Sequence, residues 1–158
     1  MRDHLAFQRC YDGRLYTDPS KERVVLTIQD IEQVLPNGFH DSTIIGLRLN
    51  YVTRTAEIDL EILISGPDDA EDSEDYRPST LSISELVYFV IEPPDSRYLS
   101  QSETPLLIDG GSTEPEQSAS PLPKPLPAGA FTYSFFVHEW NSFIHVAALR
   151  AELVVPAK

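Results

Sequence analysis

Two histidines near the C-terminus are the residues of this sequence best placed to bind a metal ion together. If residues 139–142 form a turn, His138 opposes Phe143 and Phe136 opposes His145 across two antiparallel strands. The two imidazoles then become diagonal neighbours on one face of the sheet. Imidazole nitrogens are common ligands of zinc and related metals, so His138 and His145 could share a metal ion.

Further ligands for such a site, and a competing interpretation, are both present in the sequence. Glu139 is adjacent to the first histidine, and the distant pair His40 and Asp41 could complete the set. However, His145 belongs to an apolar row that runs through residues 143–155 in steps of two. A histidine in such a row is more often a hydrogen-bonded core residue than a ligand. Both interpretations stay open.

The run His40-Asp41-Ser42 contains the residue types of a hydrolase triad. Consecutive residues of a strand point to opposite faces, so these three side chains cannot hydrogen-bond in series as a triad requires. The alternative is structural: Asp41 and Ser42 bond to nearby backbone amides after a turn, while Phe39 anchors the strand start. We therefore expect no catalytic residue here.

Three carboxylates occur at every second position of a predicted strand, at Glu57, Asp59 and Glu61. Arg48 and Asn50 fall on the same face of the preceding strand. This row is either a solvated surface with cross-strand ion pairs or an acidic strip that docks a basic partner.

Trp140, the sole tryptophan, lies beside the predicted turn. It either fills the end of the core or stands exposed as a binding anchor, since aromatic residues are enriched at interaction hot spots. The acidic run at 67–76 lacks the glycine and the ligand spacing of a calcium loop, which favours a solvated loop.

Composition narrows the classes of function. The chain has 158 residues, with 12 Lys and Arg against 25 Asp and Glu, and a formal charge of −13. This balance argues against nucleic acid as a partner, because phosphate backbones are bound by clustered basic residues. A basic protein partner is compatible with it.

The sequence also predicts the compartment. The single cysteine, Cys10, cannot form an internal disulfide, which indicates a reducing environment. The N-terminus lacks the apolar run of a signal peptide, and no stretch is long and apolar enough to span a bilayer. We expect a cytoplasmic protein without a membrane segment and without a cofactor.

The predicted elements are mainly strands. Apolar and polar residues alternate through 43–64, with Ile45, Leu47, Leu49 and Tyr51 on one face of the first strand and Ile58, Leu60, Ile62 and Ile64 on the second. A capping box at Thr27 predicts a short helix over 28–35. Further predicted segments are a strand at 80–91, a short edge strand at 105–109, a Pro/Ser/Gly-rich surface loop at 109–129 and two strands within 131–155.

Together these elements predict a single domain over 1–158 of the mainly β (β-rich α+β) class. An antiparallel curved sheet or a sandwich, with one short helix near residues 28–35, is expected, since no β-α-β alternation occurs.

Three segments resemble a family of small uncharacterised bacterial proteins with no assigned activity. They are LPNGFHDS at 35–42, IEPPDSRY at 91–98 and FFVHEWNSFI at 135–144. This resemblance covers roughly residues 28–155. The Phe-His-Asp entry and the two alternating strands, residues 39–64, are also similar to immunity proteins of bacterial polymorphic toxin systems. Neither resemblance implies a catalytic residue.

Three hypotheses of function follow. The preferred one is a non-enzymatic protein-binding module that covers a basic partner with its acidic face, as an immunity-like inhibitor would. Glu57, Asp59, Glu61 and Trp140 are its candidate binding residues. The alternatives are a metal-dependent or hydrolytic enzyme using His138 and His145, and a structural or accessory protein without a site.

Overall fold

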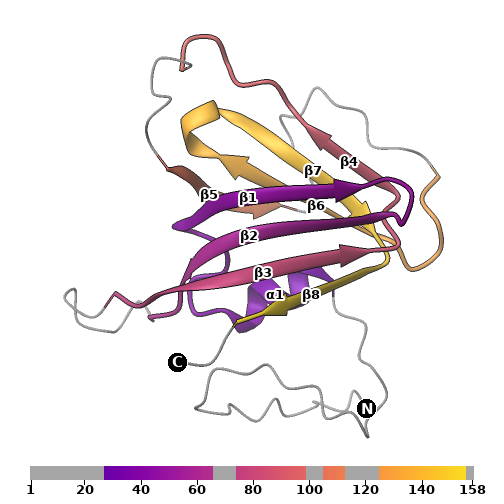
Figure 1. Cartoon of the computed structure of the whole chain (residues 1–158), viewed down its shortest axis with the longest axis horizontal. Coiled ribbons are helices and arrows are strands. Elements are labelled where there is room, and N and C mark those ends of the chain that lie inside the picture. Colours follow the sequence, from indigo (N-terminus) through magenta and orange to yellow (C-terminus); the bar gives the residue numbers. More distant parts are fainter. Residues whose placement is uncertain (1–26, 66–73, 99–104, 113–124, 156–158) are drawn as a thin grey trace, which may run out of the picture.

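The computed structural model of the chain describes residues 27–65, 74–98, 105–112 and 125–155. One short helix and eight strands occupy these residues: α1 (Ile28–Val34), β1 (Ser42–Asn50), β2 (Thr55–Leu63), β3 (Tyr76–Ser84), β4 (Tyr88–Ile91), β5 (Leu106–Ser112), β6 (Phe131–Val137), β7 (Ser142–Ala148) and β8 (Arg150–Val154), with a 3-10 turn, η3 (His138–Trp140), between β6 and β7. The strands form one antiparallel, open and curved sheet in the order β4-β7-β6-β5-β1-β2-β3-β8 (Figure 1). The predicted fold class is confirmed.

Several sequence predictions lie outside the described residues. These are the environment of Cys10, most of the acidic run at 67–76 and most of the predicted loop at 109–129. Within the described part of the chain, no helix has the length and apolar character needed to cross a membrane.

Helix α1 begins and ends where its local sequence dictates. The Thr27 hydroxyl accepts a hydrogen bond from the Asp30 amide (3.1 Å), and the Asp30 carboxylate accepts one from the Thr27 amide (2.8 Å). This reciprocal capping box satisfies two amides that a helix start leaves unpaired. The helix ends before Leu35, because the following Pro36 disfavours helical geometry at the residue before it. The predicted helix is confirmed.

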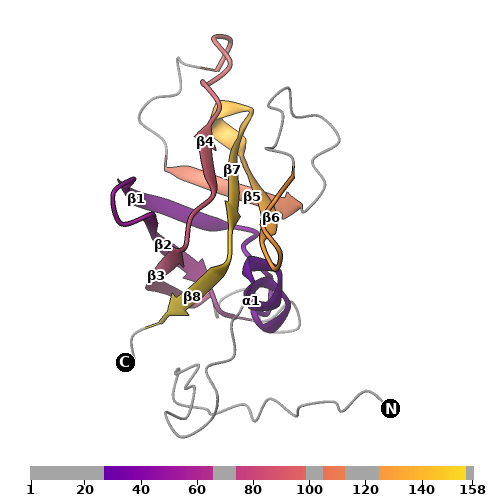
Figure 2. The ribbon, with the colours of Figure 1, turned by 90° about the vertical axis from the view of Figure 1, so that its right-hand side faces the viewer.

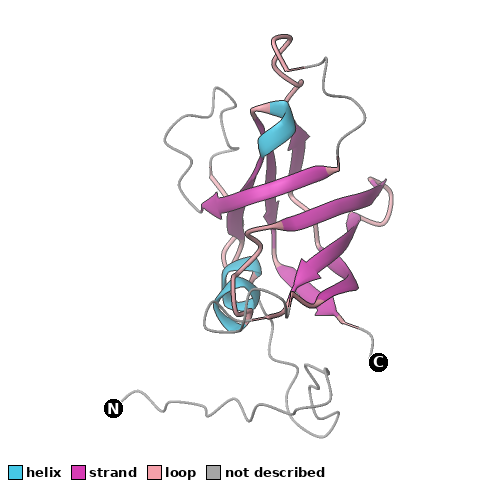
Figure 3. Cartoon of the chain, turned by 90° about the vertical axis from the view of Figure 1, so that its left-hand side faces the viewer, coloured by secondary structure: helices cyan, strands magenta, loops and turns pink. Residues whose placement is uncertain are grey.

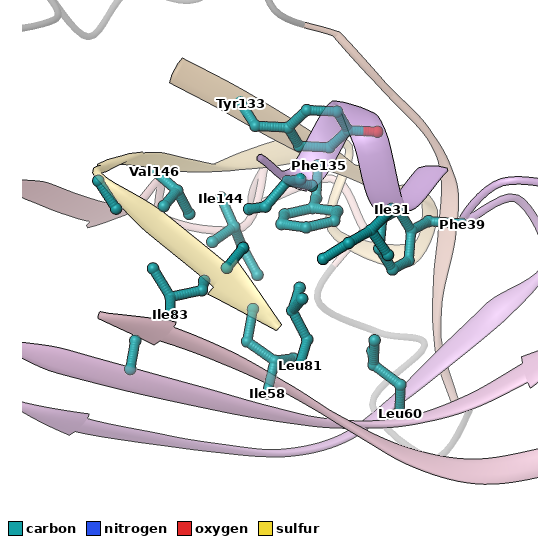
Figure 4. Packing of buried hydrophobic residues seen from close by; sticks show 14 of the residues in the cluster. Ile31, Phe39, Ile58, Leu60, Leu81, Ile83, Tyr133, Phe135, Ile144 and Val146 are labelled. Atoms are coloured by element: carbon teal, nitrogen blue, oxygen red, sulfur yellow. The ribbon is translucent and has the colours of Figure 1, made fainter. Parts of the chain in front are cut away.

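The helix packs on the inner side of the sheet. Ile28 and Ile31 are fully buried there. Phe39 lies beside them and makes edge contacts with Tyr133 and Phe135 of β6, at ring-centroid distances of 6.3 and 5.4 Å. Figure 4 shows this aromatic group facing the aliphatic residues of β2 and β3 across the core. Burial of these apolar side chains is the main favourable term in the stability of the domain.

Strands β1 and β2 form the predicted hairpin, but a bulge in β1 changes which residues face inward. Ile44 is opposite Leu60 and Gly46 is opposite Asp59, so Ile45 is the extra residue. Ile45 is consequently 61% exposed, and Ile44 packs against the core instead. Tyr51, in the turn, is also exposed. The predicted inward positions of Ile45 and Tyr51 are therefore wrong.

On β2 the predicted inner face is confirmed. Ile58, Leu60 and Ile62 are buried, and the residues between them point outward. Ile64, beyond the end of the strand, is partly buried against the same core.

The predicted strand at 80–91 is two strands. Glu85 adopts a left-handed conformation (φ 54°), which ends β3 and redirects the chain into β4. Strand β3 lies between β2 and β8, whereas β4 pairs with β7. The predicted end at Pro93 and Pro94 is confirmed, since β4 stops at Ile91.

Strand β5 is not an edge strand. It lies between β1 and β6 in the middle of the sheet. It also extends to Ser112, so the loop predicted from residue 109 starts later than expected. An irregularity between Ile108 and Gly111 interrupts its pairing with β6.

The C-terminal segment holds three strands rather than two. Ile144 and Val146 of β7 face the core, whereas Ala151 and Leu153 do so on β8. Leu149 lies between the two strands and shifts the inward positions from even to odd numbers. The single apolar row predicted for 143–155 is wrong for β7 and correct for β8.

Two long chain segments, β3–β4 and β7–β8, connect the two ends of the sheet. The chain segment of β3 and β4 runs antiparallel to that of β7 and β8, with Ser84 opposite Arg150 and Tyr88 opposite Ala147. The sheet therefore curls around its own core, and α1 fills its inner side (Figures 2 and 3). The outer side of β1, β2, β3 and β8 forms a separate surface.

Candidate functional site

The outer side of strands β1, β2, β3 and β8 carries a group of carboxylates that we call the acidic face. Glu57, Asp59 and Glu61 of β2 point outward because Ile58 and Leu60 occupy the inner side. The predicted strip is thus present as one surface. Thr80 of β3 is opposite Asp59, and Pro78 is opposite Glu61.

Glu152 extends this face to the edge strand β8. It is exposed and lies opposite Ser82 of β3, which in turn lies opposite Glu57. The acidic face is therefore defined by Glu57, Asp59, Glu61 and Glu152. Sequence analysis missed Glu152, although the alternation Ala151-Glu152-Leu153 already indicates that it points away from the core.

Arg48 of β1 lies at the β1 margin of the acidic face, opposite Glu57 and on the far side of β2 from β8. Its Nε is 2.9 Å from Oε2 of Glu57, and its Nη2 is 3.0 Å from Oδ1 of Asp59. The Thr80 hydroxyl donates a further hydrogen bond to Asp59 (3.1 Å). The bonds from Arg48 are the largest cause of a lowered pKa of Asp59, so this carboxyl stays ionised in the folded protein.

The remaining carboxylates of the face keep their charge uncompensated. Neither Glu61 nor Glu152 forms a side-chain ion pair with the described part of the chain. All arginines of the described ranges are already engaged: Arg48 with Glu57 and Asp59, Arg54 with the Leu86 carbonyl, Arg77 with Asp75, Arg97 with Asp95, and Arg150 with Glu85. No lysine lies in those ranges. The surface thus combines excess negative charge with cations that are committed to internal partners.

The predicted pairing of His138 with His145 does not occur. The turn between β6 and β7 is the 3-10 segment η3, and it ends in a left-handed Asn141 (φ 46°). This geometry places Phe136 opposite Phe143 and Ser134 opposite His145, two residues away from the predicted register. His138 lies on η3, beyond the end of the β6–β7 ladder, and has different partners from His145. The geometric basis for a shared metal site is therefore wrong.

His145 is instead the centre of a buried polar chain. Its Nδ1 lies 2.7 Å from the Ser134 hydroxyl, and its Nε2 lies 2.9 Å from Oε1 of Glu92. The other oxygen of Glu92 accepts a hydrogen bond from the Phe143 amide (3.0 Å). His145 has no exposed surface, and its ring stacks on Phe143 at 5.7 Å.

The group Ser134, His145 and Glu92 has the residue types of a hydrolytic triad, yet its burial matches a structural role. Ser134 is only 1% exposed, so a substrate carbonyl has no access to its oxygen. Each polar side-chain atom of Ser134, His145 and Glu92 is hydrogen-bonded, as buried polar groups generally must be. Of the two interpretations of His145, metal ligand or hydrogen-bonded core residue, the second describes this geometry.

His138 belongs to a different, exposed group that includes His40. The His40 ring lies 2.9 Å from Asp41 through Nδ1 and 3.0 Å from Asp109 through Nε2. His138 lies 3.5 Å from the other oxygen of Asp109. Asp109 of β5 therefore joins the segments of His40 and His138, whereas His145 does not belong to this group. Among the described residues, no three His, Cys, Asp or Glu side chains are arranged to hold a metal ion.

Trp140 is partly buried and packs against the hydrophobic core. Its carbonyl accepts a hydrogen bond from the Asp95 amide (2.9 Å), which ties η3 to the segment after β4. Asp95 also holds Arg97, and the hydrogen bonds from Arg97 keep the pKa of Asp95 far below its usual range. Trp140 lies outside the acidic face, so the structure does not bring these two predicted binding features together.

No family model matches the chain, and neither a curated protein nor a solved structure matches it. The arguments on function therefore rest on the geometry described above.

Proposed function

We propose that this chain is a non-enzymatic protein-binding module that docks a basic protein on its acidic face. One observation carries the proposal: Glu61 and Glu152 are exposed carboxylates that form no ion pair with the described residues, on a surface where Arg48 is already committed. A partner's lysine or arginine side chains would supply the missing counter-charges. Such complementarity steers association and selects against acidic competitors.

The position of the carboxylates supports a partner with separated basic residues. Glu61 and Glu152 lie on strands that are separated by β3 and are four positions apart along the strands. Standard strand spacings place them roughly 16 Å apart. Arg48 already pairs with Glu57 and Asp59 at the β1 margin, so the best-matched surface has one basic side chain for Glu61 and another for Glu152.

The rigidity of the scaffold supports binding on this face. The carboxylates belong to β2 and β8, whose inner sides are fixed by the core. A backbone that is held by a sheet loses little conformational entropy when a partner binds, so the entropy cost is confined to ordering the side chains. The resemblance to immunity proteins adds a more specific proposal, in which the partner is a basic toxin that the module inhibits. The single cysteine favours the cytoplasm as its location.

The test is capture of partners from lysate of the native cell by the full chain. Wild-type protein should retain a basic protein at low salt and release it at high salt, because exposed charge pairs are screened. The double variant Glu61→Lys/Glu152→Lys should lose this protein. Reversing Glu57 or Asp59 is less informative, since it also removes the ion pairs of Arg48. Equal capture by wild type and double variant would refute the proposal.

A further inference from the structure

The junction between β1 and β5, which we call the seam, joins the two halves of the sheet. Strand β1 pairs with β2 along almost its whole length, from Thr43 to Asn50. With β5 it pairs at three positions, Ser42 with Ile108, Thr43 with Leu107 and Ile44 with Leu106. Because a short ladder contributes few cooperative hydrogen bonds, the seam is a place where local opening should cost little.

Side chains reinforce the seam at one end. The Asp41 amide donates to the Ile108 carbonyl (3.0 Å), which extends the ladder by one bond. Beyond it, the His40 ring bridges Asp41 on its own segment and Asp109 on β5. Asp41 holds a left-handed conformation (φ 62°), which aspartate adopts more readily than most residues, and this turns the chain into β1.

We propose that His40 is a pH-sensitive clasp across the seam. The imidazolium attracts the carboxylates of Asp41 and Asp109 and holds the start of β1 against β5. When the ring loses its proton, two carboxylates face each other without a cation between them. The like charges then repel, and the end of the seam opens more often.

Other groups that face this point modify the clasp without replacing it. His138 of η3 approaches Asp109 at 3.5 Å, so it partly offsets the charge of Asp109 when it is protonated. The pKa of Tyr76 in β3 is raised, mainly by burial and then by the negative charges of Glu74 and Asp41. Glu139 accepts a hydrogen bond from the Leu107 amide (2.6 Å) and fixes β5 to η3 from the other side.

The direction of the pH effect follows from the charges. The hydrogen bond to Asp41, and the negative charges of Asp41 and Asp109, raise the pKa of His40 above its ordinary value of 6.5. A raised pKa in the folded state means that the clasp contributes fully below about pH 6.5. Its contribution is lost as the pH rises through the pKa of the folded state.

The test is amide hydrogen exchange of the full chain, measured by NMR at pH 5.5 and pH 8 and corrected for the intrinsic exchange rate. The Asp41 amide reports on the seam, and amides of the β1–β2 ladder serve as an internal reference. The wild type should show about threefold more frequent opening at the seam at the higher pH. In His40→Gln this pH dependence should vanish, while His138→Gln should keep most of it.

A second measurement keeps the inference testable if exchange is too fast to follow. The His40 ring should titrate above 6.5 in the wild type, and its pKa should fall in Asp109→Asn. An unchanged pKa in that variant, or equal pH dependence of seam opening in wild type and His40→Gln, would overturn the clasp.

Discussion

The hydroxyl of Tyr133 in β6 donates a hydrogen bond of 2.6 Å to Oε1 of Glu32 in α1. This bond fixes the only helix of the described ranges to the sheet and satisfies a phenol that is almost completely buried. Tyr133→Phe should therefore lower the free energy of unfolding by about 1.5 kcal/mol, the usual contribution of a hydrogen bond to a charged acceptor. Urea denaturation at pH 7 measures this change.

The same pair predicts a dependence on alkaline pH. Burial, reinforced by Glu32, raises the pKa of Tyr133 well above its ordinary value of 10.0. This stabilising contribution is present below about pH 10 and is lost as the pH rises further toward the pKa of the folded state. Wild type should thus lose more stability between pH 9 and pH 11 than Tyr133→Phe does. Parallel losses would mean that the Tyr133 hydroxyl does not govern alkaline unfolding.

Gly111 of β5 is required by the position of the Tyr133 ring. A Cβ at this position would lie 2.1 Å from the Tyr133 hydroxyl, far inside van der Waals contact. Gly111→Ala should therefore destabilise the domain by about 2–3 kcal/mol, as overpacking of a core does. Gly46→Ala is the matched control, since its new Cβ would meet only Asp59 at 3.4 Å. Thermal melts that show equal losses for both variants would contradict the packing described here.

The buried position of Ser134 predicts its reactivity. A fluorophosphonate reagent that labels nucleophilic serines should leave Ser134 unmodified in the folded protein, because the side chain is 1% exposed. Mass spectrometry of the treated protein checks this expectation. Rapid labelling that disappears in His145→Ala would instead indicate a working hydrolase and revive the enzyme hypothesis.

Removing Arg48 should change binding and stability in opposite directions. Arg48→Ala leaves Glu57 and Asp59 without their internal cation, which makes the acidic face more negative. Affinity for a basic partner should rise about threefold to tenfold, whereas the unfolding free energy should fall by less than about 1 kcal/mol, as for exposed ion pairs. Weaker binding by this variant would show that Arg48 contacts the partner directly.

Local features of the sequence predicted much of this fold. The capping box at Thr27 and the proline at position 36 determine α1 within a few residues, and the alternation on β2 identifies its inner face. These signals depend on neighbours in the chain, which a single sequence displays completely. Glu57, Asp59 and Glu61 could be assigned to one outer face for the same reason.

The errors occur where one residue changes the alternation or redirects the chain. The bulge at Ile45 and the break at Leu149 each shift the alternation of inward and outward residues by one position. The left-handed residue Glu85 ends β3 in a segment without glycine, where no residue type signals a turn, and the turn before β7 occupies residues 138–141 rather than 139–142. The register at His145 was consequently wrong by two positions.

Contacts between distant segments were beyond a single sequence. Glu92 reaches His145 across the β4–β7 pair, and Asp109 joins His40 to His138. Both depend on the position of a strand within the sheet, and strand order is determined by the whole core rather than by local pattern. Glu152 belongs to the acidic face because β8 lies beside β3.

The most direct test of the acidic face is the dissociation constant of the captured basic partner, measured by calorimetry against the full chain. Glu61→Lys/Glu152→Lys should weaken binding at least about tenfold, because two favourable charge contacts become repulsive. The control Gln29→Lys/Gln33→Lys adds two positive charges on α1, away from the acidic face, and should retain nearly wild-type affinity. Equal weakening in both variants, or none in the first, would contradict docking on Glu57, Asp59, Glu61 and Glu152.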